Sequence, residues 1–300
     1  GTGGIIGMNE SEKDLSYLVN GAFVGRQLTD NVTNRFAGGI IGNQNNSTGS
    51  GWNIKDCLNY GTVYCYKTHY SGGIIGQWTG SGGTIEDCRN YGNLQTTYAA
   101  PWVGASGGIV AQLYHAYEGQ EYNIIGCGNY GDIYTRDGKG SGVNDGANDS
   151  AGILGNVTTY QADGVESGQK FTIQILDCVN APEVEIYSAS MASGIFGFLS
   201  CDTPTIDNVE RSTQNVQIRI ERCRNFASVL KGHYYTAGIF GDRYGANTGW
   251  NQNMIVKDNM SLNLDNSHYY GSNEGSGWPV YARGNWKGNS GNMKSENRGG

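Results

Sequence analysis

Hydrophobic residues occur along this chain as short pairs framed by glycines, and a polar turn follows each pair. The first pair reads Gly-Gly-Ile-Ile-Gly, and its second glycine recurs at Gly4, Gly39, Gly73, Gly108, Gly152, Gly194 and Gly238. These glycines are separated in turn by 35, 34, 35, 44, 42 and 44 positions. Such self-similarity is typical of a solenoid, in which each unit buries its apolar face on its neighbours. The pattern therefore predicts about seven stacked units.

The second half of each repeat is a Cys-x-Asn turn, found at Cys57, Cys88, Cys127, Cys178 and Cys223. Short apolar runs between Gly, Asn and Thr, without a 3.6-residue period, favour strands over helices. We expect roughly three short strands per repeat: at the Ile pair, around Cys-x-Asn, and at the Gly-x-Val that follows. The predicted fold is all-β, a parallel β-helix of about seven rungs with loop insertions.

Side-chain alternation predicts which residues of a rung face inward. Cys57, Asn59 and Val63 share one parity, whereas Ile54 lies three residues before Cys57 and breaks it, so a corner or bulge belongs between them. Identical residues on successive rungs stack, and we expect the Asn amides to form a ladder. The second residue of each Ile pair forms either an outward apolar stripe or, if the flanking glycines bend the chain, part of the core; burial is favoured.

The combination Gly-Gly-Ile-Ile-Gly with Ile-x-x-Cys-x-Asn-x-Gly-x-Val resembles the GLUG repeat of bacterial surface proteins, which also occurs in non-catalytic regions of immunoglobulin A-cleaving metalloproteases. The resemblance covers residues 1 to about 262. It implies a right-handed parallel β-helix in an extracellular, adhesin-like or stalk-like bacterial protein, and it implies no chemistry. Residues 263–300 lose the repeat and are predicted to form an irregular cap or mobile tail.

Composition narrows the set of partners. The net charge is −7 and the pI is about 5.1, without clusters of Lys and Arg, which disfavours nucleic acid and anionic membranes as partners. No apolar run is long enough to insert into a membrane. Glycans or host surface proteins remain as ligands, and the open end of the solenoid suggests self-association. The five repeat cysteines are expected in the core as reduced thiols, as is Cys65.

Aromatic residues are the leading candidates for ligand binding. If the Asn residues face inward, Tyr60, Tyr91 and Tyr130 face outward and form a ladder, which we interpret as a flat surface for sugar rings. Trp52, Trp78 and Trp102 are expected near solvent on loops, where indoles bind glycans. The competing interpretation is that the tyrosines only cover the backbone and the tryptophans only pack loops.

Acidic residues give a weaker signal, and no catalytic residue is assigned. Asp137, Asn144, Asp145 and Asp149 gather oxygen ligands on a glycine-rich stretch and form a weak candidate Ca²⁺ site that lacks EF-hand spacing. No other cofactor is expected. The predicted function is a non-catalytic, extracellular binding or adhesion module. The alternatives are a polysaccharide lyase or hydrolase on the same scaffold, and a passive spacer.

Overall fold

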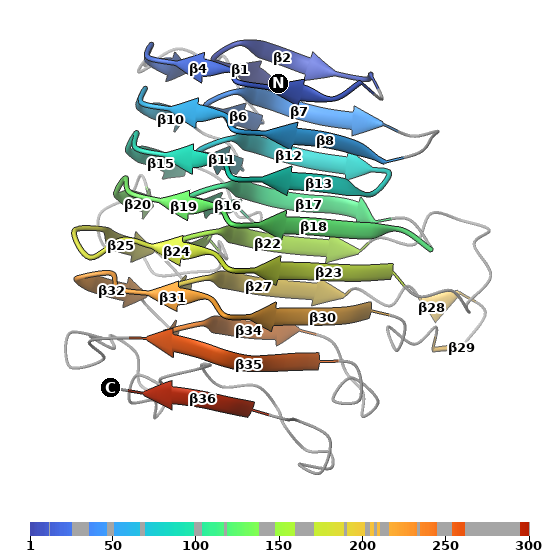
Figure 1. Ribbon diagram of the computed structural model, residues 1–300, viewed down its shortest axis with the longest axis vertical. Coiled ribbons are helices and arrows are strands. Elements are labelled where there is room, and N and C mark those ends of the chain that lie inside the picture. Colours follow the sequence, from blue (N-terminus) through green and yellow to red (C-terminus); the bar gives the residue numbers. More distant parts are fainter. Residues whose placement is uncertain are drawn as a thin grey trace.

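The chain forms an all-β stack of parallel strands in a computed structural model, which confirms the predicted parallel solenoid (Figure 1). The structure describes residues 1–11, 13–25, 36–46, 51–66, 70–98, 104–116, 119–137, 148–159, 171–188, 191–201, 205–206, 209–210, 216–232, 235–244, 254–261 and 295–299. Within these ranges no helix is present, and so none has the length and apolar character needed to cross a membrane.

Two of the sheets contain the strands on either side of the Gly-Gly step. Sheet A consists of β1 (Thr2–Gly3), β6 (Phe36–Gly38), β11 (Tyr70–Gly72), β16 (Gly104–Gly107), β21 (Asn148–Ala151), β26 (Met191–Ser193) and β33 (Tyr235–Ala237). Sheet B consists of β2 (Ile6–Asn9), β7 (Ile41–Asn46), β12 (Ile75–Gly80), β17 (Val110–Ala116), β22 (Leu154–Thr159), β27 (Phe196–Cys201) and β34 (Phe240–Tyr244).

The largest sheet, sheet C, has a long and a short column of strands joined at β35. The long column is β3 (Leu15–Ser16), β8 (Trp52–Lys55), β13 (Gly83–Glu86), β18 (Glu121–Ile125), β23 (Phe171–Leu176), β30 (Val216–Glu221) and β35 (Met254–Ser261). The short column is β4 (Val19–Asn20), β9 (Leu58–Asn59), β14 (Arg89–Asn90), β19 (Gly128–Asn129), β24 (Val179–Asn180) and β31 (Arg224–Asn225). β36 (Ser295–Gly299), the one described part of the expected cap, pairs in parallel with β35.

Sheet D completes each coil. It consists of β5 (Val24–Gly25), β10 (Val63–Tyr66), β15 (Leu94–Tyr98), β20 (Ile133–Asp137), β25 (Glu185–Ser188) and β32 (Val229–Gly232). A separate antiparallel hairpin joins β28 (Thr205–Ile206) to β29 (Val209–Glu210). A full coil therefore contains five strand segments, and the expectation of three was wrong because each corner interrupts the strand hydrogen bonding.

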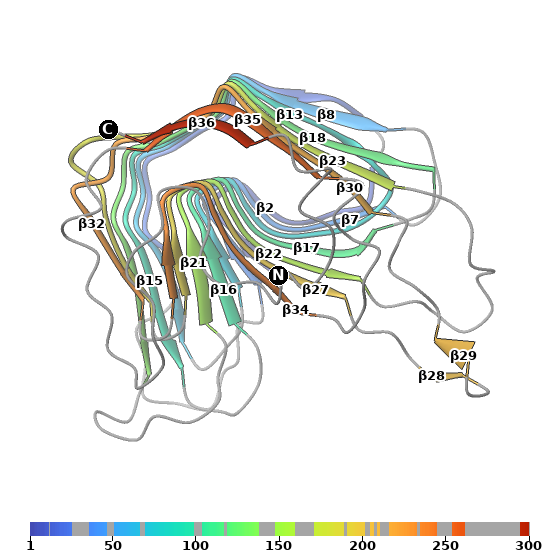
Figure 2. The same cartoon turned by 90° about the horizontal axis from the view of Figure 1, so that it is seen from below.

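The cross-section of the stack is bent into two arms (Figure 2). In one arm sheet B packs on the long column of sheet C, and the core between them includes Ile75, Trp78 and Ile85. In the other arm sheet A packs on sheet D around residues such as Val63 and Leu94. The solenoid thus has two separate apolar cores rather than a single bore.

The Ile pair marks the bend between sheets A and B. The amides of Ile40 and Ile41 both donate to the carbonyl oxygen of Ile74, at 3.1 and 2.9 Å. The backbone N–H groups of two successive residues therefore point the same way along the stack. Ile40 and Ile41 are both 0% exposed, and the same holds for Ile74 and Ile75. The inward interpretation of the second isoleucine is confirmed, because the bend overrides the alternation of a regular strand.

The inner Asn ladder lies at the elbow where the two arms meet. Each amide nitrogen donates to the side-chain oxygen of the next coil, from Asn20 to Asn59 at 2.8 Å and from Asn59 to Asn90 at 2.8 Å. The ladder continues through Asn129, Asn180 and Asn225, and ends at the hydroxyl of Ser261. The predicted ladder is confirmed, and it satisfies polar groups that would otherwise be buried between two apolar cores.

The corner between the two columns of sheet C was also predicted correctly. Asp56, Asp87 and Asp177 occupy the position before the cysteine and have φ angles of 53°, 52° and 56°. Gly126 takes the same place in the fourth coil with a φ of 63°. Only Gly, and to a lesser degree Asp and Asn, enters this left-handed region at small cost. The repeated aspartates are therefore turn-forming residues.

The cysteine column lies in the core of the first arm. Cys57, Cys88, Cys127, Cys178 and Cys223 are free and buried, as expected, and Cys65 is buried in the second arm. The Cys178 thiol donates to the carbonyl oxygens of Leu176 at 3.3 Å and Ile124 at 3.5 Å. Burial, reinforced by the thiols of Cys127 and Cys223, raises the pKa of Cys178, which keeps this thiol protonated and unreactive.

Candidate functional site: an outward tyrosine ladder

Three tyrosines form a continuous ladder on the outside of the elbow. Tyr60, Tyr91 and Tyr130 each follow a ladder asparagine, and because the Asn side chain faces inward, the tyrosine faces outward. The rings of Tyr60 and Tyr91 stack with centroids 4.9 Å apart and an interplanar angle of 8°. The rings of Tyr91 and Tyr130 follow at 4.8 Å and 19°. The predicted ladder is present with the predicted residues.

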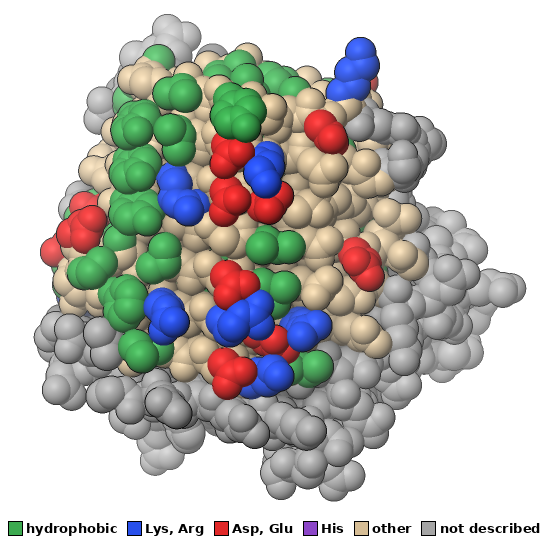
Figure 3. Space-filling model, viewed as in Figure 1, with side chains coloured by type: hydrophobic (Ala, Val, Ile, Leu, Met, Phe, Trp, Pro, Cys, Tyr) green, Lys and Arg blue, Asp and Glu red, His purple; other side chains and the backbone are tan. Residues whose placement is uncertain are grey.

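The ladder is accessible at one end and packed at the other. Tyr60 is 53% exposed and Tyr91 41%, whereas Tyr130 is partly buried against the core of the second arm. Partial burial raises the pKa of the Tyr91 hydroxyl, and Tyr130 and Tyr60 act in the same direction. The Tyr91 hydroxyl therefore remains protonated at neutral pH and is available as a hydrogen-bond donor. Figure 3 shows hydrophobic side chains gathered along one side of this face of the molecule.

The stacking corrects the expectation of a flat surface for sugars. Rings that stack on one another cover each other's faces and present their edges to solvent, so a ligand can lie flat only on an end of the ladder. At the open end the preceding coil carries Gly21 in the equivalent position, and nothing lies within 4 Å of the place where its Cβ would be. At the other end the next coil carries Ala181, which is 1% exposed. One ring face, that of Tyr60 above Gly21, is therefore open.

The expected exposure of two tryptophans was wrong. Trp52 and Trp78 are both 1% exposed in the core of the first arm, where they contact each other with ring centroids 4.6 Å apart. Tyr122 continues this internal aromatic column at 5.1 Å from Trp78. Gly, Asn and Gln around the tryptophans suggested loops, but Trp52 precedes the inward Ile54 by two residues, and this parity indicated the core. Trp102 lies outside the described residues.

The candidate calcium ligands do not assemble on a surface loop in the described structure. Asp149 lies in β21 and is 0% exposed, with Oδ2 accepting from Nδ2 of Asn156 at 3.2 Å, so its expected place on a glycine-rich loop was wrong. Asp137 is the last residue of β20, and Asn144 and Asp145 lie outside the described residues. Among the residues that the structure describes, no group of three or more His, Cys, Asp or Glu could hold a metal ion.

A second outward tyrosine pair, on sheet D, was not predicted. Tyr134 and Tyr187 stack at 5.3 Å and 14°, and the Tyr134 hydroxyl donates to Glu185 at 3.2 Å and Asp132 at 3.4 Å. Burial and these two carboxylates raise the pKa of Tyr134, which keeps its proton in place. Oδ1 of Asp132 also accepts from the backbone amide of Glu185 at 2.9 Å. The repeated acid-x-Tyr spacing, one coil apart, was the signal in the sequence.

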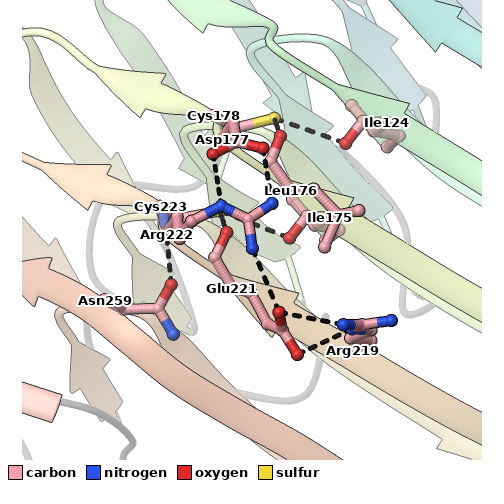
Figure 4. Close-up of polar contacts among 10 residues, drawn as sticks. All are labelled: Ile124, Ile175, Leu176, Asp177, Cys178, Arg219, Glu221, Arg222, Cys223 and Asn259. Carbon is pink, nitrogen blue, oxygen red and sulfur yellow. Dashed lines mark hydrogen bonds and ion pairs between the residues drawn. The ribbon is translucent and has the colours of Figure 1, made fainter.

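Charged side chains are concentrated at the corner of sheet C (Figure 3). Figure 4 shows the group near its C-terminal end, where Arg222 contacts both oxygens of Asp177 at 2.7 Å. Glu221 is 1% exposed and is bound by Arg219 at 2.6 and 3.1 Å and by Arg222 at 3.2 Å. The two arginines compensate a carboxylate that would otherwise be costly to bury.

The ion pairs at this corner should make the stability of the fold sensitive to acid. The hydrogen bond from Arg219 holds the pKa of Glu221 below its ordinary value of 4.5, so the stabilisation is present above pH 4.5 and is lost as pH falls through the lower, folded-state value. We expect the urea midpoint to fall between pH 5 and pH 3, roughly, and the fall to be smaller in Glu221→Gln. The exposed residue Glu121 provides a matched control, because Glu121→Gln should keep the wild-type pH dependence. An unchanged pH dependence in Glu221→Gln would contradict this assignment.

No family model, curated protein or solved structure matches the chain.

Proposed function

We propose that this chain is a non-catalytic, extracellular binding module that takes carbohydrate on its outward tyrosine ladder. The observation that carries the proposal is the open ring face of Tyr60 above Gly21, continued by the exposed edge of Tyr91. An aromatic ring with one free face and a polar tip suits a sugar, whose C–H face packs on the ring while its hydroxyls meet polar groups. We further propose a bacterial cell-surface location, for which the GLUG-like repeat is the support.

The neighbouring pair on sheet D supplies polar groups of the type that sugars need. Asp132 and Tyr134 follow Tyr130 along the same coil and also lie on the outside. The Tyr134 hydroxyl donates to the carboxylates of both Asp132 and Glu185. These carboxylates are held in fixed positions, where their oxygens can accept hydrogen bonds from a ligand. A reaction would require an acid and a base free to exchange protons with a substrate. The mutual hydrogen bonding of these residues favours binding over catalysis.

The first test is a broad glycan array probed with the purified chain, with and without Ca²⁺, with mass spectrometry of the same sugars. Binding without cleavage is the expected result. Cleavage would instead support a carbohydrate-active enzyme. Silence in both channels would contradict the carbohydrate proposal and favour a host-protein ligand or a passive spacer.

Two substitutions test the open ring face directly. Tyr60→Ala removes the platform and should weaken glycan binding by about tenfold or more, which corresponds to about 1.4 kcal/mol. Gly21→Tyr should cover the Tyr60 face by extending the ladder, and should abolish binding without unfolding the chain, because the space at Gly21 is empty. Tyr17→Ala is the control, since Tyr17 is 75% exposed in the same coil as Gly21 but lies outside the ladder. Undiminished binding by Gly21→Tyr would place the ligand elsewhere.

A further inference from the structure

Arg89 lies beside the tyrosine ladder, on the same outward face as Tyr91. Because Asn90 between them faces inward in the asparagine ladder, the alternation of the strand turns Arg89 and Tyr91 outward together. The equivalent position is occupied by Leu58 in the coil before and by Gly128 in the coil after. Among these three positions, which flank the three stacked rings, Arg89 supplies the positive charge.

The glycine of the next coil leaves room for the Arg89 side chain. A Cβ at Gly128 would lie 2.8 Å from Cε2 of Tyr130 and 3.0 Å from Cδ of Arg89. Both side chains therefore occupy the space above Gly128, and the stem of the arginine runs beside the Tyr130 ring. Burial raises the pKa of the Tyr91 hydroxyl, whereas the positive charge of Arg89 lowers it. Arg89 is thus close to the ladder both in space and in its electrostatic effect.

One nitrogen of this guanidinium is anchored and the other two are free. Nη1 of Arg89 donates to the carbonyl oxygens of Gly126 at 2.6 Å and Cys88 at 3.1 Å. Within the described ranges, Nε and Nη2 of Arg89 have no hydrogen-bond acceptor and no carboxylate forms an ion pair with this residue. Nε and Nη2 form one edge of the guanidinium, and such an edge binds a carboxylate through two parallel hydrogen bonds.

The acidic side chains of the same coil do not occupy this edge. Glu86 is paired with Lys55 at 3.0 Å. Asp87 lies over Gly126, where a Cβ would be 2.6 Å from its Oδ1, so this carboxylate lies at the anchored end of the guanidinium. The free edge therefore keeps a positive charge whose partner is not supplied by the neighbouring residues.

We infer that Arg89 makes the tyrosine ladder selective for acidic oligosaccharides, with its free edge binding the carboxylate of a uronic or sialic acid. The inference rests on the proposed function and names its ligand class. Arg89 is two coils from the open space above Gly21, about 10 Å at the spacing of stacked strands. One sugar ring cannot reach both places, so the unit stacked on Tyr60 and the acidic unit are different units of one chain. Because Nη1 is already anchored, little side-chain freedom is lost on binding.

Calorimetric titration with matched oligosaccharides tests the inference. Each pair consists of a uronic- or sialic-acid oligosaccharide and its methyl ester, which keeps the sugar rings and removes the charge. We expect the acid to bind about tenfold or more tighter than its ester. Arg89→Gln should abolish this preference and leave the affinity for the ester unchanged. Arg89→Lys should restore only part of the preference, because an ammonium cannot bind a carboxylate bidentately.

Arg224→Gln is the matched control, because Arg224 occupies the same column three coils further along the stack. It changes the net charge equally and should keep the wild-type preference. If Arg89→Gln is unfolded by circular dichroism, Arg89→Lys decides, and an undiminished preference in that variant would count against the inference.

Four results would overturn the inference and leave the proposed function in place. These are equal affinity of the wild type for acid and ester, a preference that survives Arg89→Gln, an equal loss of acid and ester in folded Arg89→Gln, and glycan ligands that all lack a carboxylate. A chain that binds no glycan at all would overturn the inference together with the proposed function.

Discussion

Replacing Ile74 by aspartate should unfold several coils of the stack. Ile74 is 0% exposed and lies in the core of the first arm, among buried apolar residues. An unpaired carboxylate at this position loses its hydration without compensation, and the packing of the isoleucine is lost as well. The expected cost is about 5 kcal/mol or more, a large fraction of the stability of an ordinary domain.

The structure predicts how this damage spreads. The Ile74 amide donates to Ile109 of the next coil, and the Ile74 carbonyl accepts from Ile40 and Ile41 of the previous one. In a solenoid each unit is stabilised mainly by its nearest neighbours, so the loss should be largest in the coils that contain Ile40, Ile74 and Ile109 and should decline with distance. Hydrogen exchange resolved by peptide should show this gradient.

Two controls make the result interpretable. Ile74→Val keeps the apolar character and should cost only about 1 kcal/mol, measured by urea unfolding. Ile255→Asp places the same charge at a position that is 43% exposed and should have little effect. If Ile74→Asp unfolded with the wild-type midpoint, the assignment of this column to the core would be wrong.

The sequence was most informative where one residue type recurs in one column. Asn59 and Asn90 occupy the same position on adjacent coils, where the side-chain amide of one can donate to the side-chain oxygen of the other. The observed ladder contains this hydrogen bond. The break in parity between Ile54 and Cys57 indicated a corner, and the positive φ angle of Asp56, which lies between them, confirms it. Column identity therefore predicted both the local conformation and the direction of the side chain.

The same patterns could not predict the shape of the coil. Alternation within a strand shows which side of that strand is apolar, but not which other column it packs against. Val63 and Ile54 both face inward, yet they lie in different arms. The separation depends on the elbow, where Asn59 contacts Gly39, and this contact joins residues 20 positions apart in sequence. Contacts of that range are not visible in a local pattern.

For the candidate site, the positions were predicted but their geometry was not. Tyr60, Tyr91 and Tyr130 were placed outward by parity alone, as the structure finds. The spacing between coils puts equivalent rings in contact, so the rings cover one another's faces. The expected ligand position therefore changes from the whole ladder to its open end. Trp52 shows the converse error, because polar neighbours were given more weight than parity.

Replacing Gly108 by alanine should be almost as damaging as placing a charge in the core, although it adds only one methyl group. A Cβ at this position would overlap the carbonyl oxygen of Gly152 and the side-chain carbons of Asn129, the ladder residue of the same coil. Neither neighbour is free to move, because the Asn129 amide donates to Gly131 and Asn180 at 2.9 and 3.0 Å, and the Gly152 amide donates to the Ser193 carbonyl oxygen at 3.1 Å. The methyl group would therefore break the ladder or force the two arms apart.

We expect Gly108→Ala to cost about 3 kcal/mol or more in urea unfolding, at the upper end for overpacking. Gly7→Ala is the control: Gly7 is the last glycine of the repeat motif in the first coil, and its nearest neighbour, the Gly1 carbonyl oxygen, would lie 3.4 Å from the new Cβ. The double variant Gly108→Ala with Asn129→Gly removes one of the overlapping side chains. It should recover little stability, since the overlap with the Gly152 backbone remains and the ladder is interrupted. Full recovery in the double variant would show instead that Asn129 alone, and not the close approach of adjacent coils, requires glycine at the elbow.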